Sequence, residues 1–385
     1  MVYEYILQQT CKYVNDIECG KNGGKHVKKI ILSAFLLIFL IYFLPFGITA
    51  LQERTNNPAK EHAVSRVEKS DGSQEEIEQI ASKEGKSSDY SSDVSEPSEN
   101  TAETPIQIAV SIDDTVRQMD LESYVAGVTA AEMPASFPEE ALKAQAIAAR
   151  TFAQSKRISD SDDVHPDADV CDDYTHCAAY LDLETQAEEQ WGSEADEWRE
   201  KIEDAVQQTS GQIVTYGGEP ITAVFHAACG SETESAADVW GADVPYLISV
   251  DSTGDEACPD YTSSVTFGAE EFRQLMLQKY ENINLTGMPE TWFTDFTRTD
   301  AGNVLRCTVG GVHAKGTTLR SLLGLRSTNF TVSTTETSIT FETTGYGHAV
   351  GMSQYGAKAM AEQGSSCEEI LTHYYTGTEI SEITE

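Results

Sequence analysis

The sequence predicts an α+β fold for residues 105–385, as a bilobed domain of mixed helix and sheet. One observation is an alanine-rich helical pattern from Pro138 to about Lys156. A second is the pair Gly217-Gly218 between two short strand-like runs, which predicts a hairpin. A third is that helical and strand patterns mix without a regular βαβ alternation, which argues against a parallel doubly wound sheet.

The first elements follow from local patterns. Ile106 to Val116 alternates as a strand pair that turns at Asp113-Asp114, and Leu121 to Val125 begins a short helix. Pro138 suits the first position of the next helix, because its fixed φ is helical and its missing N–H is not needed there. Glu139 and Glu140 then complement the helix dipole.

The later elements are predicted in the same way. A helix near Glu194–Thr209 has Trp198, Ile202, Ala205 and Val206 on one stripe, and Gly211 suits its C-terminal end. The hairpin strands are Gln212–Tyr216 and Ile221–Phe225, and Gly268 to Tyr280 is predicted as a helix. The remaining predicted strands are Val304–Val309, Phe330–Val332 and Ser338–Thr343.

The N-terminal third predicts a membrane anchor and a stalk. Ile30 to Leu51 has no charged residue and is long enough to cross a bilayer as a helix. Lysines precede it, so we expect residues 1–29 to form a cytoplasmic tail and the rest to lie outside the cell. A cleaved signal peptide is the alternative, but the apolar run is long and no cleavage site stands out. Residues 52–104 are polar and acidic, which predicts a disordered stalk.

The composition limits the possible partners. The chain has 26 basic and 63 acidic residues, a net charge of −37. Such a surface repels phosphates and anionic lipid headgroups, so it argues against nucleic acid and against binding to anionic membrane surfaces. Uncharged glycan strands remain possible ligands.

The segment from Ala130 to Thr151 carries the strongest chemical signal. Glu132 stands among alanine, methionine and proline just before the predicted helix, and Lys143 and Arg150 point nearly the same way from that helix. A carboxylate with apolar neighbours beside a cationic ridge suits acid/base catalysis. It equally suits a structural ion pair.

This segment resembles the characteristic sequence motif of the stage II sporulation protein D family. Members of this family are septal peptidoglycan lytic transglycosylases of spore-forming bacteria. The family's catalytic glutamate maps onto Glu132. Two further blocks match, Phe225–Leu247 and Gly345–Ala357, and the resemblance extends from about residue 105 to 380. The long stretch between the first two blocks is expected to form a second lobe, with substrate bound between lobes.

The resemblance implies cleavage of the MurNAc-β-1,4-GlcNAc bond with formation of 1,6-anhydro-MurNAc ends. Ordinary glycoside hydrolysis needs two carboxylates, and the motif supplies one. One is enough if the muramyl C6 hydroxyl attacks its own anomeric carbon. Glu132 must then hold a proton near neutral pH, which requires a pKa raised by desolvation. Met133, Pro134 and Phe137 are candidates for the apolar wall.

Further polar residues of the three blocks are candidates for substrate binding, and each has an ordinary structural role as its alternative. These candidates are Lys143, Arg150, His226, Tyr246, His348, Ser353, Gln354 and Tyr355.

One polar loop predicts a structural zinc site. His165, Cys171 and Cys177 match a histidine and two cysteines through which certain clostridial relatives bind zinc, with His176, an aspartate or water as the fourth ligand. The alternative is a Cys171–Cys177 disulfide. Four further cysteines could form two disulfides or remain free thiols: Cys229, Cys258, Cys307 and Cys367.

Other functions stay open. A second is a peptidoglycan-binding module of the amidase-enhancer type, which does not cut glycan. A third is a muramidase in which Asp113, Glu232 or Asp238 activates water. A zinc peptidase is the weakest alternative, because no His-Glu-x-x-His motif occurs. The resemblance also implies partners, a peptidoglycan amidase/endopeptidase and a membrane anchor protein of the engulfment complex.

Overall fold

The computed structural model describes residues 105–113, 115–159, 165 and 167–384. These residues belong to one compact unit, Glu68–Glu385. The predicted cytoplasmic tail, membrane span (30–51) and stalk (52–104) lie outside the described residues. Among the described helices, none has the length and apolar character needed to cross a membrane.

Helices and strands are mixed along the chain, which confirms the α+β class. The first group of elements surrounds a core cluster that includes Leu121, Leu142 and Ile202. Its strands form a sheet in the order β2-β1-β3. The elements are β1 (Gln107–Ile112), β2 (Thr115–Asp120), α4 (Leu121–Glu132), α5 (Glu139–Arg157), β3 (Val170–Cys171), α6 (Ala187–Trp191), η1 (Gly192–Glu194) and α7 (Ala195–Gln208).

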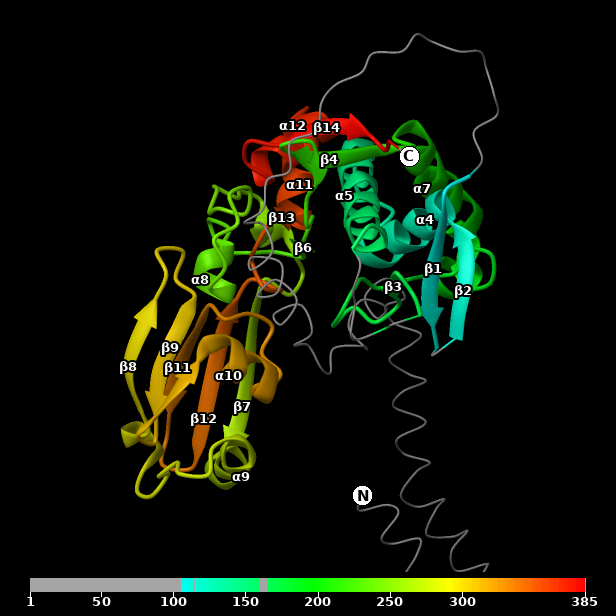
Figure 1. The fold of residues 1–385 in the computed structure, drawn as a ribbon. Helices are drawn as coiled ribbons and strands as arrows, with labels where there is room; N and C mark the ends of the chain where they lie inside the picture. The colour runs from blue at the N-terminus through cyan, green and yellow to red at the C-terminus, as the bar shows by residue number, and fades with distance from the viewer. Residues whose placement is uncertain (1–104, 114, 160–164, 166, 385) are drawn as a thin grey trace, which may run out of the picture. The chain divides into compact units, whose positions relative to one another are not determined.

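Helix α5 lies at the centre of this part of the molecule. It packs against α4 and α7 and also against α11 and α12, which come from the end of the chain (Figure 1). Its side chains from Ala141 to Gln154 are almost all buried. Alanine makes this possible, because its small side chain lets several helices approach closely.

A second group of elements contains the second and third motif blocks and packs around Val350, Met352 and Tyr375. The sheet order is β14-β4-β5, and β6 pairs in parallel with β13. The elements are β4 (Gln212–Tyr216), β5 (Glu219–Pro220), β6 (Phe225–His226), α8 (Ala236–Trp240), η2 (Asp255–Ala257), β13 (Met352–Ser353), α11 (Gln354–Glu362), α12 (Cys367–Tyr374) and β14 (Glu379–Glu382).

A third group has a core of its own, built on Phe272, Trp292 and Phe341. It contains two three-stranded sheets, β11-β12-β7 and β10-β9-β8. The elements are β7 (Thr262–Gly268), α9 (Ala269–Lys279), η3 (Pro289–Thr291), β8 (Phe293–Arg298), β9 (Val304–Val309), β10 (Val312–Lys315), α10 (Gly316–Leu323), β11 (Phe330–Thr334) and β12 (Ser338–Thr344).

Two expectations need correction. The stretch between the first two motif blocks does not form a separate lobe, because Ile202 and Val206 of α7 pack in the first core. The separate core comes from residues 262–344 instead. The hairpin turns at Gly217-Gly218, both with positive φ, but its second strand is only Glu219–Pro220. Phe225 pairs with Met352, a partner remote in sequence.

Candidate active site

Glu132 is the last residue of α4. The helix begins at a cap, where Asp120 accepts a hydrogen bond from the Ser123 N–H at 3.1 Å. It ends because Pro134 disfavours helical backbone at the residue before it, and Met133 is extended. The sequence thereby sets the carboxylate at a helix terminus and not along a helix face.

Two polar groups hold this carboxylate. The Ala179 N–H donates to Glu132 Oε1 at 2.7 Å, and the Gln354 side-chain amide lies 3.5 Å from Oε2. The same amide lies 3.5 Å from Oε1 of Gln145, a fully buried residue of α5. The site thus joins the end of α4, the loop after β3, α5 and the start of α11.

Burial raises the pKa of Glu132, while hydrogen bonds from Ala179 and Gln354 oppose this shift. No lysine or arginine among the described residues forms an ion pair with it. A nearby cation would lower the pKa and remove the proton that an acid catalyst needs. The arrangement therefore suits a general acid.

Both cations of the predicted ridge have other partners. Lys143 pairs with Glu139 at 2.8 Å and with Glu140 at 3.0 Å, within its own helix. Arg150 is 0% exposed and donates to Glu122 with Nε and Nη2, the latter at 2.6 Å. Its remaining donors meet backbone carbonyls. This geometry favours structural roles for both over contact with substrate.

The two predicted histidines lie together. The rings of His226 and His348 are 5.6 Å apart, and Trp240 lies 5.3 Å from His348. Burial lowers the pKa of His226 to about 4, and burial also lowers the pKa of His348. Both rings are therefore neutral at physiological pH.

The other candidates differ in exposure. Ser353 is fully buried, caps α11 by accepting from the Gly356 N–H and donates to Asp255. Tyr246 is buried, and its hydroxyl accepts from the Thr222 N–H. Tyr355 is half-buried, and Gln354 is the candidate that reaches Glu132.

Two of the three residues expected to form an apolar wall beside Glu132 are buried. Met133 and Phe137 are buried in the first core, whereas Pro134 is exposed. The Phe137 ring meets Tyr355 edge-on at 5.1 Å. This contact ties the segment after Glu132 to the helix that carries Gln354.

Four side chains that could hold a metal ion cluster in the loop before Ala179. The ligand atoms of His165, Cys171, His176 and Cys177 all lie within 4.8 Å of one another. His165 Nε2 is 3.3 Å from the Cys177 sulfur, and its Nδ1 contacts the Ala168 carbonyl at 3.0 Å. Two imidazoles and two thiols suit tetrahedral zinc, and the carbonyl orients the ring.

The same loop closes against α4. Tyr180 stacks on Tyr124 at 5.9 Å, and the Leu181 N–H bonds to the Gly127 carbonyl. A Cβ at Gly127 would lie 2.3 Å from the Tyr180 ring, so only glycine fits there. The loop that carries the thiols therefore also supplies the N–H that holds Glu132.

The described cysteines are free thiols. Cys171 and Cys177 belong to the cluster, and Cys229 bonds to the buried carboxylate of Asp255 at 3.1 Å. Cys307 lies in the third core. Cys229, Cys258, Cys307 and Cys367 could have formed two disulfides or remained reduced, and in the structure all four are free thiols.

The sequence analysis did not identify two residues of the site, and it did not decide whether a third residue was a ligand. Gln145 had a signal, because a glutamine in an alanine-rich helix face is a buried polar group that needs a partner. Ala179 had none, since it contributes only its backbone. His176 was one of several options for a fourth ligand, and the structure places it in the cluster.

Comparison with known proteins finds related sequences. A family described as Stage II sporulation protein matches residues 112–216. Stage II sporulation protein D of Bacillus subtilis (strain 168) is 38% identical over 292 residues, 74% of this chain and 83% of that protein. Its counterpart from Bacillus amyloliquefaciens is 39% identical over 282 residues, 73% of this chain and 80% of that protein.

A further relative is an amidase enhancer of Bacillus subtilis (strain 168). It is 30% identical over 307 residues, which cover 66% of this chain and 40% of that protein. The two sporulation proteins match at higher identity and over most of their own length. The chain belongs to the stage II sporulation protein D family.

Proposed function

We propose that the protein is a lytic transglycosylase that cleaves the MurNAc-β-1,4-GlcNAc bond of septal peptidoglycan during sporulation. The observation that carries the proposal is the environment of Glu132: a half-buried carboxyl with a raised pKa, held by two neutral donors and by no cation of the described part of the chain. Among the described residues, no carboxylate contributes to the shift of its pKa. A site with one acid suits a reaction in which the substrate supplies the nucleophile.

The proposed reaction consumes no water. Glu132 donates its proton to the glucosamine oxygen as the bond from that oxygen to the muramyl anomeric carbon breaks. The muramyl C6 hydroxyl attacks the same carbon, forms the new C–O bond and returns its proton to Glu132. The carboxyl is restored, and the product has a 1,6-anhydro end. A positioned acid/base of this kind contributes about 10²- to 10⁴-fold in rate.

We further propose that a structural zinc ion is held by His165, Cys171, His176 and Cys177. The four donors and their mutual distances support this assignment. When bound, the ion would cross-link the loop and take no part in the reaction. The residues after the cluster do the positioning, because the Ala179 N–H fixes one oxygen of Glu132.

Location and partners are also part of the proposal. Residues 30–51 would anchor the chain in the cell membrane, with the N-terminus cytoplasmic and the catalytic part in the wall outside. An amidase/endopeptidase and a membrane anchor protein of the engulfment complex are the proposed partners. The relative named amidase enhancer supports an amidase as one of them.

The same relative favours a second function, a non-cleaving amidase enhancer. Purified full-length chain, incubated with stem-free glycan strands, separates the possibilities by mass spectrometry of the products. Anhydro ends support the transglycosylase, and reducing ends, heavier by one water, support a muramidase. Intact strands, together with faster turnover by an added amidase, support the enhancer.

A further inference from the structure

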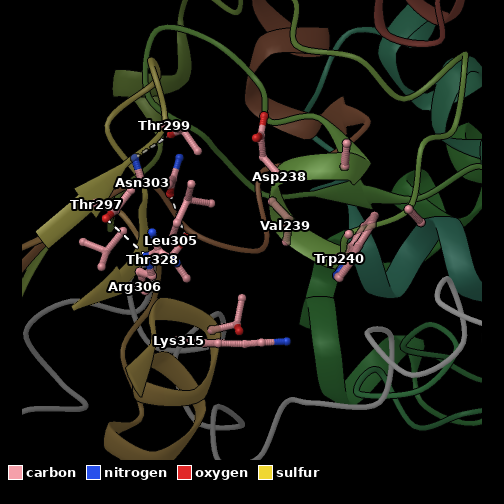
Figure 2. Close-up of a pocket in the computed structure, with 15 residues that line it drawn as sticks. Asp238, Val239, Trp240, Thr297, Thr299, Asn303, Leu305, Arg306, Lys315 and Thr328 are labelled. Carbon is pink, nitrogen blue, oxygen red and sulfur yellow. Dashed lines mark hydrogen bonds between the residues drawn. The ribbon is translucent and has the colours of Figure 1, made fainter. Parts of the chain in front are cut away.

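A pocket of about 670 Å³ lies between α8 and the sheet β10-β9-β8 (Figure 2). One wall is residues 237–242, and the other comes chiefly from β8, β9 and the end of β10. Neither Glu132 nor a group that holds it lines this pocket. The contacts that position the carboxyl lie elsewhere, around the turn of residues 133–138 that joins α4 to α5.

This turn begins directly after Glu132. The Phe137 N–H donates to the Pro134 carbonyl at 2.9 Å and closes the turn. Ala135 and Phe137 are buried in the first core. Their carbonyls accept no hydrogen bond from a backbone N–H of the described residues. Because a buried carbonyl without a donor is costly, a group outside the turn has to supply the hydrogen bonds.

Lys201 of α7 supplies both of them. Its Nζ donates to the Ala135 carbonyl at 2.9 Å and to the Phe137 carbonyl at 2.6 Å. The next residue, Ile202, is buried in the first core and fixes the helix that carries the ammonium. Helix α7 also packs against both α4 and α5 (Figure 1). Lys201 therefore ties α7 to the turn between those two helices.

These partners are unusual for a lysine in so acidic a chain. The net charge is −37, yet no carboxylate of the described residues forms an ion pair with Lys201. Burial lowers the pKa of Lys201, while the charges of Glu139 and Glu197 oppose the shift. The charge of Lys201 is not among the causes that shift the pKa of Glu132. The ammonium can thus hold the turn without ionising the acid.

The other side of the turn contacts α11. The Phe137 ring meets the Tyr355 ring edge-on at 5.1 Å, and the Lys358 ammonium lies 5.8 Å from the centre of the Phe137 ring. Helix α11 begins with Gln354, whose amide lies beside Glu132. A shift of the turn would therefore change the position of Glu132 relative to Gln354.

We infer that Lys201 is a positioning residue for Glu132. Its ammonium fixes the turn and thereby keeps the carboxyl beside the Ala179 N–H and the Gln354 amide. The inference rests on the proposed function and adds a residue to its machinery. Lys201 acts through the turn and takes no part in the proton transfer. Misplacing a reacting group by about 1 Å can cost about 10²-fold in rate, so a loosened turn should slow the chemical step.

The test replaces Lys201 by methionine in the full-length chain, which keeps the apolar stem but removes the donors. We expect kcat on stem-free glycan to fall about 10- to 100-fold with KM little changed. Residue-resolved hydrogen exchange should show a faster Ala179 amide, because this N–H would lose its acceptor on Glu132. Lys201→Arg retains donors for both carbonyls and should restore kcat and the slow exchange at Ala179.

Arg199→Met is the matched control, because it removes a cation of the same helix whose ion-pair partner is Asp196, also on α7. This variant should keep the parental kcat and the parental exchange rate at Ala179. Lys201→Gln, which keeps one amide donor, gives the same comparison if the methionine variant does not fold.

The inference is overturned if removing the ammonium leaves either kcat or exchange at Ala179 at the parental value. A parent chain that forms no anhydro ends would refute the proposed function instead. Exchange at Ala179 would still report whether Lys201 holds Glu132 in place, so either idea can fail while the other stands.

Discussion

At the level of single residues, the protonation of Glu132 decides whether the chemistry can work. Burial raises its pKa, and the N–H of Ala179 and the amide of Gln354 stabilise the ionised form. The proposed reaction starts from the protonated carboxyl. Activity should therefore be lost as pH rises through the pKa of Glu132, at a higher pH than for an ordinary glutamate.

Gln354→Leu tests this balance. The substitution removes a donor that favours the carboxylate, so the pKa of Glu132 should rise and the alkaline limb of the rate profile should move to higher pH. The measurement is kcat against pH on stem-free glycan. Gln363→Leu, at the exposed end of the same helix, should leave the limb in place. An unmoved limb in Gln354→Leu would show that this amide does not tune the acid.

Arg150 should matter for stability. Arg150→Met leaves the partly exposed Glu122 without its guanidinium partner, and losing these hydrogen bonds to a charged group should cost about 1.5–3 kcal/mol of unfolding free energy. Urea unfolding measures the loss. Arg157→Met, near the exposed end of the same helix, should cost much less. Unchanged stability with a raised KM would instead make Arg150 a substrate ligand.

At the level of elements, the loop between β3 and α6 connects the cluster of His165, Cys171, His176 and Cys177 to the acid. Its contacts with α4 depend on Gly127, where a Cβ would collide with the Tyr180 ring. A displaced loop would carry the Ala179 N–H away from Glu132. The geometry of the acid therefore depends on how closely this loop packs on α4.

Gly127→Ala should lower kcat and cost about 1–3 kcal/mol of unfolding free energy, the usual cost of overpacking. Glycan cleavage and urea unfolding measure the two effects. Gly268→Ala is the control, because its Cβ would meet nothing within 4 Å and its φ is negative. A Gly127→Ala chain with parental kcat would separate the loop from catalysis.

Metal removal tests the loop in a second way. The Cys171→Ser/Cys177→Ser variant should lose bound zinc, and the amides of residues 178–181 should exchange hydrogen faster because the loop is no longer cross-linked. Elemental analysis and hydrogen exchange measure these changes. Cys367→Ser lies outside the cluster and should keep the zinc. A parent chain without zinc would refute the assignment.

At the level of the whole molecule, the sequence predicted single helices, turns and strands better than it predicted contacts between segments distant in the chain. The helix at α5, the turn at Gly217-Gly218 and the strand β9 follow from composition and periodicity, and they are confirmed. The separate core at residues 262–344 was missed, because it depends on which distant strands pair. Sequence could propose Glu132 but could not show that Gln145 and Ala179 would meet there.

Replacing Glu132 by glutamine tests the central claim most directly. The amide keeps the shape of the side chain but cannot donate and recover the proton. The rate at which stem-free strands gain anhydro ends should fall by about 10²- to 10⁴-fold, while Glu139→Gln on the exposed first turn of α5 should keep the parental rate. Anhydro ends formed by Glu132→Gln at the parental rate would contradict the account.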